Sequence, residues 1–169
     1  MEVEKTTSEL MIYKTLNRDI EKAWVTWAID MLMSGYETEH LNILAGKAEP
    51  FNPFEMEKLV NKVFIELKID YSYTEQRFKN YACYLIDKSL NGEVDNFNAL
   101  DLLRKLFLDT EEDHLYDFYL LFFAKYDLTN SEVQWYWEGA GRGNIDQIIT
   151  DYFIKYITQY KINCVLDKR

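Results

Sequence analysis

The stretch 144-NIDQIITDYFIKYITQY-160 decides the fold class, because its apolar residues recur at the spacing of one helical face. These residues follow the i, i+3, i+4, i+7 pattern without a miss: Ile145, Ile148, Ile149, Tyr152, Phe153, Tyr156, Ile157 and Tyr160. A half-buried strand would instead alternate between apolar and polar residues. The stretch therefore predicts an amphipathic helix that begins at Asn144.

The same pattern recurs through the earlier sequence. It predicts helices over about 8–33, 41–45, 53–67, 74–90, 95–107, 115–126 and 129–137. No alternating pattern of useful length competes with them, and no repeat of the kind that builds a solenoid is present. The sequence therefore predicts an all-α fold of about eight helices, packed as a single compact domain over residues 1–169.

Several helix ends carry local signals. Gly35 is placed to end the first helix, and Asn52 can cap the helix that begins at Pro53, where a missing N–H costs nothing. Thr74 is the expected cap of a later helix. The stretch Thr129–Glu132 resembles a capping box, and it predicts a short helix that contains Trp135, Tyr136 and Trp137.

The stretch from Leu115 to Tyr126 is apolar on nearly every side of a helix. Such a helix is expected where other helices surround it. We therefore expect the segment Phe118 to Ala124 to form the centre of the fold.

Composition indicates a folded protein of a reducing compartment. Of 169 residues 48% are hydrophobic, and the only cysteines, Cys83 and Cys164, lie in apolar helical patterns, which favours buried free thiols. The first residues are acidic where a signal peptide is basic, and the longest apolar run, Phe118 to Ala124, is too short to span a membrane. We expect a cytoplasmic protein without a membrane partner.

The net charge of −10 is concentrated in one segment. Residues 91–151 carry 13 acidic against 4 basic residues. Binding to a nucleic-acid backbone relies on Lys and Arg residues that displace counterions. Because acidic residues outnumber basic ones in this chain, we do not expect DNA or RNA to be a direct ligand. A basic protein is the favoured partner.

Both histidines occur in a Glu-x-x-His frame, Glu37 with His40 and Glu111 with His114. On a helix this spacing places two metal ligands on one face, and di-iron bundles use two such pairs. Those bundles also need an inward Glu from two further helices, and no carboxylate interrupts the apolar stripes here. Solvated residues of first helical turns are the competing interpretation, and no cofactor is predicted.

The glycine-rich turn 139-GAGRGN-144 precedes the last helix. Arg142 and free N–H groups at a helix start can bind an anion, although a tight turn between helices explains the glycines as well. No nucleophile elbow occurs, and neither cysteine has a histidine nearby in sequence. The sequence thus gives no sign of an enzyme.

The strongest local charge feature is the acidic run Asp109, Glu111, Glu112 and Asp113, followed by Asp117. Trp135, Tyr136 and Trp137 come soon after it. Aromatic residues often anchor protein interfaces, and acidic surroundings attract a basic partner. These eight residues are the predicted partner-binding surface, with a solvated loop and core aromatics as the alternative.

A further pattern runs from Trp24 to Ile69, and its most specific part is Leu44-Ala45-Gly46 followed by Asn52-Pro53-Phe54-Glu55. In these residues the chain resembles a group of short bacterial helical proteins with no established activity. The resemblance implies a bacterial origin and carries over no catalytic residue.

By size, charge and fold class the chain also looks like the immunity proteins that neutralise basic bacterial toxins. We therefore expect a non-enzymatic interaction protein that binds a basic protein, in a role like that of an immunity protein. A helical metal protein that uses the two Glu-x-x-His frames is the main alternative. Self-association through aromatic surfaces is the third possibility.

Overall fold

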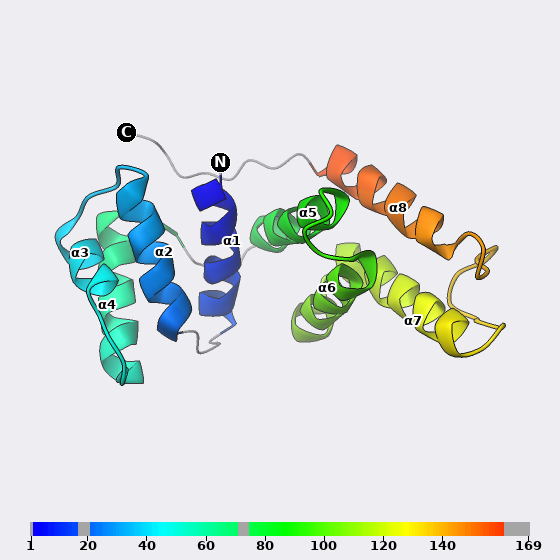
Figure 1. The fold of residues 1–169 in the computed structure, drawn as a ribbon, viewed down its shortest axis with the longest axis horizontal. Helices are drawn as coiled ribbons and strands as arrows, with labels where there is room; N and C mark the ends of the chain where they lie inside the picture. Colours follow the sequence, from blue (N-terminus) through cyan, green and yellow to red (C-terminus); the bar gives the residue numbers. More distant parts are fainter. Residues whose placement is uncertain (1, 17–20, 71–74, 161–169) are drawn as a thin grey trace. The chain divides into compact units, whose positions relative to one another are not determined.

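Eight α-helices and one short 3-10 helix make up the described part of the chain in the computed structural model, and that part contains no strand (Figure 1). The structure describes residues 2–16, 21–70 and 75–160. The prediction of an all-α fold with about eight helices is confirmed.

Contacts between residues divide the chain into two compact units. The N-terminal unit extends to Arg77 and contains α1 (Glu2–Thr15), α2 (Glu21–Met33), α3 (Glu39–Ala45) and α4 (Pro53–Glu66). The C-terminal unit begins at Phe78, within α5 (Glu75–Leu90), and continues through α6 (Asn96–Thr110), the 3-10 helix η1 (Asp113–Leu115), α7 (Tyr116–Asn130) and α8 (Ile145–Gln159). Each unit has buried residues of its own, and a single domain over residues 1–169 stays a prediction.

Three aromatic rings form the centre of the core in the N-terminal unit. Trp24 and Trp27 of α2 and Phe64 of α4 meet edge to face, with ring centroids 5.7 to 5.8 Å apart. Trp27 is fully buried, and its indole N–H donates a hydrogen bond of 2.9 Å to the Thr7 hydroxyl of α1. The bond satisfies the one polar atom of this side chain, so the core can hold so large a residue.

Two predicted helix ends of this unit, at Asn52 and at Gly35, are confirmed. The Asn52 side chain accepts hydrogen bonds from the N–H groups of Phe54 and Glu55, and Pro53 occupies the first helical position of α4. Gly35 follows α2 with a φ of 88°, a left-handed conformation that suits glycine because it has no Cβ.

The prediction of one helix over about 8–33 is wrong. α1 ends at Thr15, whose hydroxyl donates to the carbonyl of Met11, and α2 begins at Glu21. The spacing of apolar residues predicts which face of a helix is buried but not where the helix ends. Because the same spacing continues from α1 into α2, the sequence pattern did not reveal the boundary between them.

The core of the C-terminal unit lies between α6, α7 and α8, with α5 contributing further buried residues. Phe118 of α7 and Phe153 of α8 are fully buried and meet at a centroid distance of 6.0 Å. The stripe that decided the fold class supplies the buried face of α8, and this helix begins after Asn144 as predicted.

The expectation that α7 is surrounded on all sides is wrong. Its buried residues Phe118, Leu121, Ala124 and Leu128 form one face, whereas Tyr116 and Tyr126 are 47% and 49% exposed. Most of the other apolar residues of this helix are aromatic, and their rings pack on one another at the surface of the unit. An apolar helix surface therefore remains open on α7.

The predicted helix over 129–137 is also absent. α7 continues to Asn130, and the Thr129 hydroxyl donates to the carbonyl of Lys125 inside that helix instead of capping a new one. The next residues form a loop, in which the Ser131 hydroxyl accepts from the N–H of Val133. Ser and Thr side chains bond locally to the backbone in several ways, so the four-residue pattern did not identify a helix start.

None of the helices in the described part of the chain combines the length and the apolar composition needed to cross a bilayer. The predicted cap Thr74 and the second cysteine, Cys164, lie outside the described residues.

Candidate functional site

The two Glu-x-x-His frames do not form helical ligand pairs. Glu111 ends α6 in a left-handed conformation with φ of 53°, and His114 lies in η1, so the chain turns sharply within the frame. His114 Nδ1 shares a hydrogen bond of 2.8 Å with the hydroxyl of Tyr156 on α8. In the other frame, Glu37 is exposed and precedes α3, which begins at Glu39. The two frames also belong to different units.

His40 instead meets a carboxylate that sequence reasoning missed. Glu66, at the end of α4, lies with Oε1 2.5 Å from His40 Nδ1, and its Oε2 accepts from the His40 backbone N–H at 3.1 Å. Hydrogen bonds from the side chains of Thr38 and His40 lower the pKa of Glu66 below its ordinary value. Because 26 residues separate His40 from Glu66, no sequence spacing could reveal this pair.

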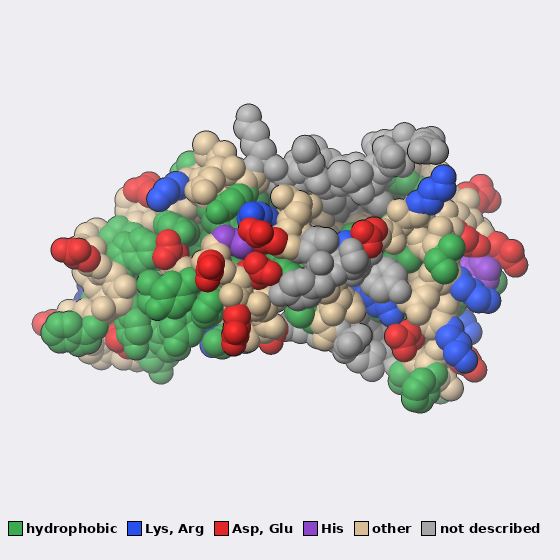
Figure 2. Space-filling model, turned by 180° about the vertical axis from the view of Figure 1, so that it is seen from behind, with side chains coloured by type: hydrophobic (Ala, Val, Ile, Leu, Met, Phe, Trp, Pro, Cys, Tyr) green, Lys and Arg blue, Asp and Glu red, His purple; other side chains and the backbone are tan. Residues whose placement is uncertain are grey.

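A continuous strip of aromatic rings crosses the surface of the C-terminal unit. Ring centroids lie 5.4 Å apart between Phe107 and Tyr116, 6.1 Å between Tyr116 and Tyr119, 4.9 Å between Tyr119 and Phe123, and 5.4 Å between Phe123 and Tyr136. We call these five residues the aromatic strip. Figure 2 shows the broad apolar area over α6 and α7, with acidic side chains beside it.

The acidic run lies at one end of the aromatic strip. Asp109, Glu111 and Asp113 are exposed, and Glu112 is half-buried. Glu111 and Asp113 line a surface hollow of about 610 Å³ together with Phe107, Leu108 and Tyr116. Two carboxylates therefore border an apolar hollow that begins the strip.

The tryptophan cluster divides between the surface and the interior. Trp135 is 90% exposed, and Tyr136, at the other end of the strip, is 40% exposed. Trp137 is half-buried and packs edge to face on Tyr152 of α8 at 5.6 Å. The aromatic strip thus runs from the acidic run to one of the three predicted aromatic residues, Tyr136, which is the sequence neighbour of the exposed Trp135.

One glutamine shapes the loop that carries these residues. The side-chain oxygen of Gln134 accepts from the N–H groups of Tyr136 and Trp137, both at 2.8 Å, and its nitrogen donates to the carbonyls of Trp137 and Ala140. The Gln134 side chain thus makes four hydrogen bonds to the backbone of this loop. They take the place of the backbone hydrogen bonds that the predicted helix would have had.

Arg142 has a structural partner. Its Nε donates to the carbonyls of Leu128 and Ser131, where α7 ends, at 2.8 and 3.1 Å. Asn144 folds back onto the glycine-rich turn, accepting from the N–H of Gly141 and donating to the carbonyl of Gly139. The turn therefore bonds to itself and to the end of α7, as the interpretation of a tight turn between helices expected.

Asp117, the last of the predicted acidic residues, contacts α8. It accepts a hydrogen bond of 2.7 Å from the Tyr152 hydroxyl, and burial, followed by the neighbouring Asp117, raises the pKa of Tyr152 above its ordinary value. Tyr152 therefore stays protonated and donates.

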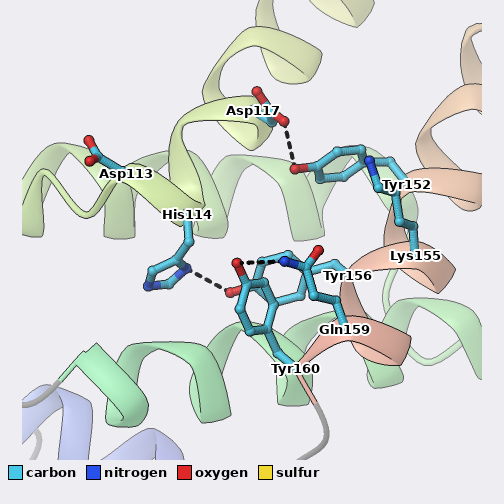
Figure 3. Close-up of a pocket in the computed structure, with 8 residues that line it drawn as sticks. All are labelled: Asp113, His114, Asp117, Tyr152, Lys155, Tyr156, Gln159 and Tyr160. Atoms are coloured by element: carbon cyan, nitrogen blue, oxygen red, sulfur yellow. Dashed lines mark hydrogen bonds between the residues drawn. The ribbon is translucent and has the colours of Figure 1, made fainter.

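This contact forms one wall of a second hollow, of about 240 Å³, which Figure 3 shows. We call it the tyrosine pocket. It is lined chiefly by Asp117, His114, Lys155 and three tyrosines of α8, Tyr152, Tyr156 and Tyr160. Sequence reasoning counted these tyrosines as apolar core. One feature of the sequence could have indicated a polar site here. The three tyrosine hydroxyls recur at every fourth position of a stripe that otherwise contains isoleucine and phenylalanine.

Cys83 is not a candidate nucleophile. It is fully buried, its thiol donates to the carbonyl of Tyr160, and burial raises its pKa to about 12. Such a thiol is almost wholly protonated at neutral pH, and the thiolate is the reactive form.

Comparison of the chain with protein-family models, with curated proteins and with solved structures finds no match.

Proposed function

We propose that this chain is a non-enzymatic interaction module that binds a basic protein through an acidic and aromatic face of its C-terminal unit. The face consists of the aromatic strip, the acidic run and Trp135. The observation that carries the proposal is the continuity of the strip, which connects the hollow beside Glu111 and Asp113 to Tyr136 in the loop that carries Trp135. An immunity-like role in the bacterial cytoplasm is the more specific form of the proposal.

Physical chemistry supports a protein as the occupant. Soluble proteins rarely expose a contiguous apolar patch without a binding role, and large aromatic side chains are the usual anchors of interfaces. A tryptophan that is 90% exposed leaves nearly all of its apolar surface in water, so covering it releases free energy. The carboxylates beside the strip then favour a positively charged partner over a neutral one.

A comparative capture experiment tests the proposal. Full-length protein would be immobilised and exposed to an extract of its source cells, beside a variant in which Asp109 and Asp113 become Asn and Glu111 and Glu112 become Gln. We expect a basic protein that the wild type enriches and that this variant and Trp135→Ala both lose. A captured protein that is acidic, or that neither variant loses, would contradict the proposal.

A matched control separates local charge from total charge. Neutralising the exposed acids Glu37, Glu49, Glu93 and Asp151 also removes four negative charges, but none belongs to the acidic run or the strip. This control should retain the partner. If it loses the partner as fully as the acidic-run variant does, the net charge of the chain and not this face governs binding.

Self-association is distinguished by molecular mass. Two copies of this face would bring like charges together, which opposes pairing. Sedimentation of the purified protein over a wide concentration range should give the mass of one chain. A dimer that Trp135→Ala dissociates would assign the face to a second copy instead.

A metal site in the N-terminal unit is the second candidate function. Glu39, His40 and Glu66 each offer one ligand atom, and these three atoms lie within 4.8 Å of one another. A nitrogen and two carboxylate oxygens suit Zn²⁺ or Mn²⁺.

Titration with Zn²⁺ would test this candidate, with calorimetry as the readout. Glu66→Gln should abolish a genuine site, whereas Glu37→Gln should leave it unchanged, because Glu37 is not among the three. If the wild type, Glu66→Gln and Glu37→Gln all bind Zn²⁺ equally weakly, the ion binds only nonspecifically to surface carboxylates, and the candidate site is wrong.

A further inference from the structure

The hollow beside the acidic run has apolar walls and two carboxylates. We call it the acidic hollow, and its lining consists of Phe107, Leu108, Glu111, Asp113 and Tyr116. Leu108 is 53% and Tyr116 47% exposed, so both side chains leave apolar surface open to solvent. At about 610 Å³ the acidic hollow has the size of a ligand site, and it has room for one long side chain.

The two carboxylates of the acidic hollow have no partner in the described part of the chain. Neither Glu111 nor Asp113 makes a side-chain hydrogen bond or an ion pair with a residue that the structure describes. Asp101, by contrast, pairs with both Arg104 and Lys105. Two negative charges that line one hollow repel each other, and a positive group beside them relieves this repulsion. The acidic hollow therefore favours a cation.

The lining of the acidic hollow contains no positive charge that would compete with such a cation. Lys155 lines the tyrosine pocket, whereas no Lys, Arg or His is among the residues that line the acidic hollow. Among the described residues, no Lys or Arg lies over the ring of Phe107 or Tyr116. A cation from outside would thus meet carboxylates and apolar walls only.

The apolar walls distinguish arginine from lysine as the source of this cation. A guanidinium is planar and less strongly hydrated than an ammonium, so it stacks on aromatic rings and tolerates apolar surroundings better. It also donates several hydrogen bonds in one plane, which suits carboxylate acceptors. Phe107 and Tyr116 supply rings 5.4 Å apart, and Glu111 and Asp113 supply the acceptors.

From these observations we propose that the acidic hollow binds an arginine side chain of the basic partner. The guanidinium binds Glu111 and Asp113 and stacks on the ring of Tyr116, while the methylene groups pack against Leu108. The inference rests on the proposed function, because the arginine belongs to the basic protein, and it names the side chain that the acidic end of the face recognises.

NMR titration of the full-length protein with Nα-acetyl-arginine amide tests this inference without the partner. We expect saturable chemical-shift changes centred on residues 107–116. Nα-acetyl-lysine amide should bind about threefold more weakly, and Nα-acetyl-citrulline amide, which has a similar shape without the charge, should not reach saturation. Equal affinity for the arginine and lysine amides would mean that the hollow selects charge alone, and equal affinity for the citrulline amide would mean that it selects shape. Either result would overturn the proposal.

Two double variants locate the site. Glu111→Gln with Asp113→Asn removes both carboxylate charges and should weaken binding of the arginine amide about tenfold. Glu93→Gln with Asp151→Asn removes two exposed charges outside the lining and should leave the affinity unchanged. If both double variants lose affinity equally, the net charge of the chain governs binding and the proposal is wrong.

Glu111→Gly separates binding from folding. Glu111 has a φ of 53°, a left-handed conformation that glycine adopts more readily than residues with a Cβ. The variant should therefore melt at a higher temperature than wild type and still bind the arginine amide about threefold more weakly. Loss of affinity in a more stable protein cannot come from misfolding. A variant that melts higher and binds as tightly as wild type would contradict the role of Glu111, and with it the proposal.

Failure of this inference is distinguishable from failure of the proposed function. Trp135 does not line the acidic hollow, so Trp135→Ala should lose the captured basic protein yet bind the arginine amide as wild type does. If the capture experiment succeeds but the arginine amide does not bind, the inference is wrong and the proposed function stands. If the amide binds but no basic protein is captured, the hollow still selects arginine, and the proposed partner is wrong.

Discussion

Glu66 shows how one carboxylate connects the ends of two helices. It accepts hydrogen bonds from the backbone and ring of His40, near the start of α3, while lying at the end of α4. A carboxylate near the first turn of α3 also meets the positive end of that helix. The contacts favour the ionised form, which is why the pKa of Glu66 lies below its ordinary value of 4.5.

The stability that Glu66 contributes should therefore depend on pH. A lowered folded-state pKa means that the contribution is complete above about pH 4.5 and is lost as the pH falls through the folded-state pKa. We expect Glu66→Gln to lower the melting temperature at pH 7, and the difference from wild type to shrink below pH 4.5. Thermal melts at several pH values would check this, with Glu37→Gln as a control that shows no such difference.

Cys83 makes a second prediction at the scale of one residue. Because burial raises its pKa to about 12, the folded protein should expose almost no thiolate at neutral pH. In a Cys164→Ser background, labelling by iodoacetamide should be slow in buffer and become fast in denaturant. Rapid labelling of the folded protein would mean that Cys83 reaches solvent.

At the scale of elements, Gln134 organises the loop between α7 and α8. Gln134→Glu keeps the acceptor oxygen for the N–H groups of Tyr136 and Trp137 but removes the donor to the carbonyls of Trp137 and Ala140. Gln134→Ala removes all four hydrogen bonds.

We expect Gln134→Ala to speed amide hydrogen exchange at Tyr136 and Trp137 and to destabilise the loop by about 1 kcal/mol per lost hydrogen bond. Gln134→Glu should protect those two amides nearly as well as wild type. If both variants exchange alike, the acceptor bonds do not hold the loop.

The elements that sequence reasoning predicted well are those whose ends carry a local signal. A helix cap contacts only backbone groups within about one turn of its own position, so its role can be predicted from the neighbouring residues. This holds for Asn52, Pro53 and Gly35. Thr129 has the same kind of local pattern, but its hydroxyl bonds backward into α7, and nothing in four residues distinguishes the two outcomes. Helix class was predictable, whereas the boundary near Thr15 and the loop after Asn130 were not.

The candidate site was predictable in part for the same reason. The acidic run and Trp135 are local features, and their exposure agrees with the surface that the sequence predicted. The aromatic strip between the acidic run and Tyr136 depends on how α6, α7 and the following loop pack, and no sequence spacing predicts that packing. The pairing of Glu66 with His40 and the contact of Asp117 with Tyr152 are tertiary contacts of the same kind.

At the scale of the whole molecule, charge and aromatic surface are concentrated in the same part of the chain. Residues 91–151 carry 13 acidic and 4 basic residues, and the described part of that segment includes the entire aromatic strip. The two features act at different stages of association. Charge acts at long range and changes the rate of encounter, whereas buried aromatic contacts act after docking and change the rate of dissociation.

Kinetics with the captured partner should separate these two contributions. We expect the wild-type association rate to fall about tenfold between low and high salt, and the acidic-run variant to show a flatter dependence at every concentration. Trp135→Ala should keep the wild-type salt dependence and instead raise the dissociation rate about thirtyfold, as removal of an interface anchor does. Surface plasmon resonance over a series of salt concentrations measures both rates. An association rate of the wild type that is insensitive to salt would refute the electrostatic role of Asp109, Glu111, Glu112 and Asp113, and an unchanged dissociation rate in Trp135→Ala would place the docking surface elsewhere on the chain.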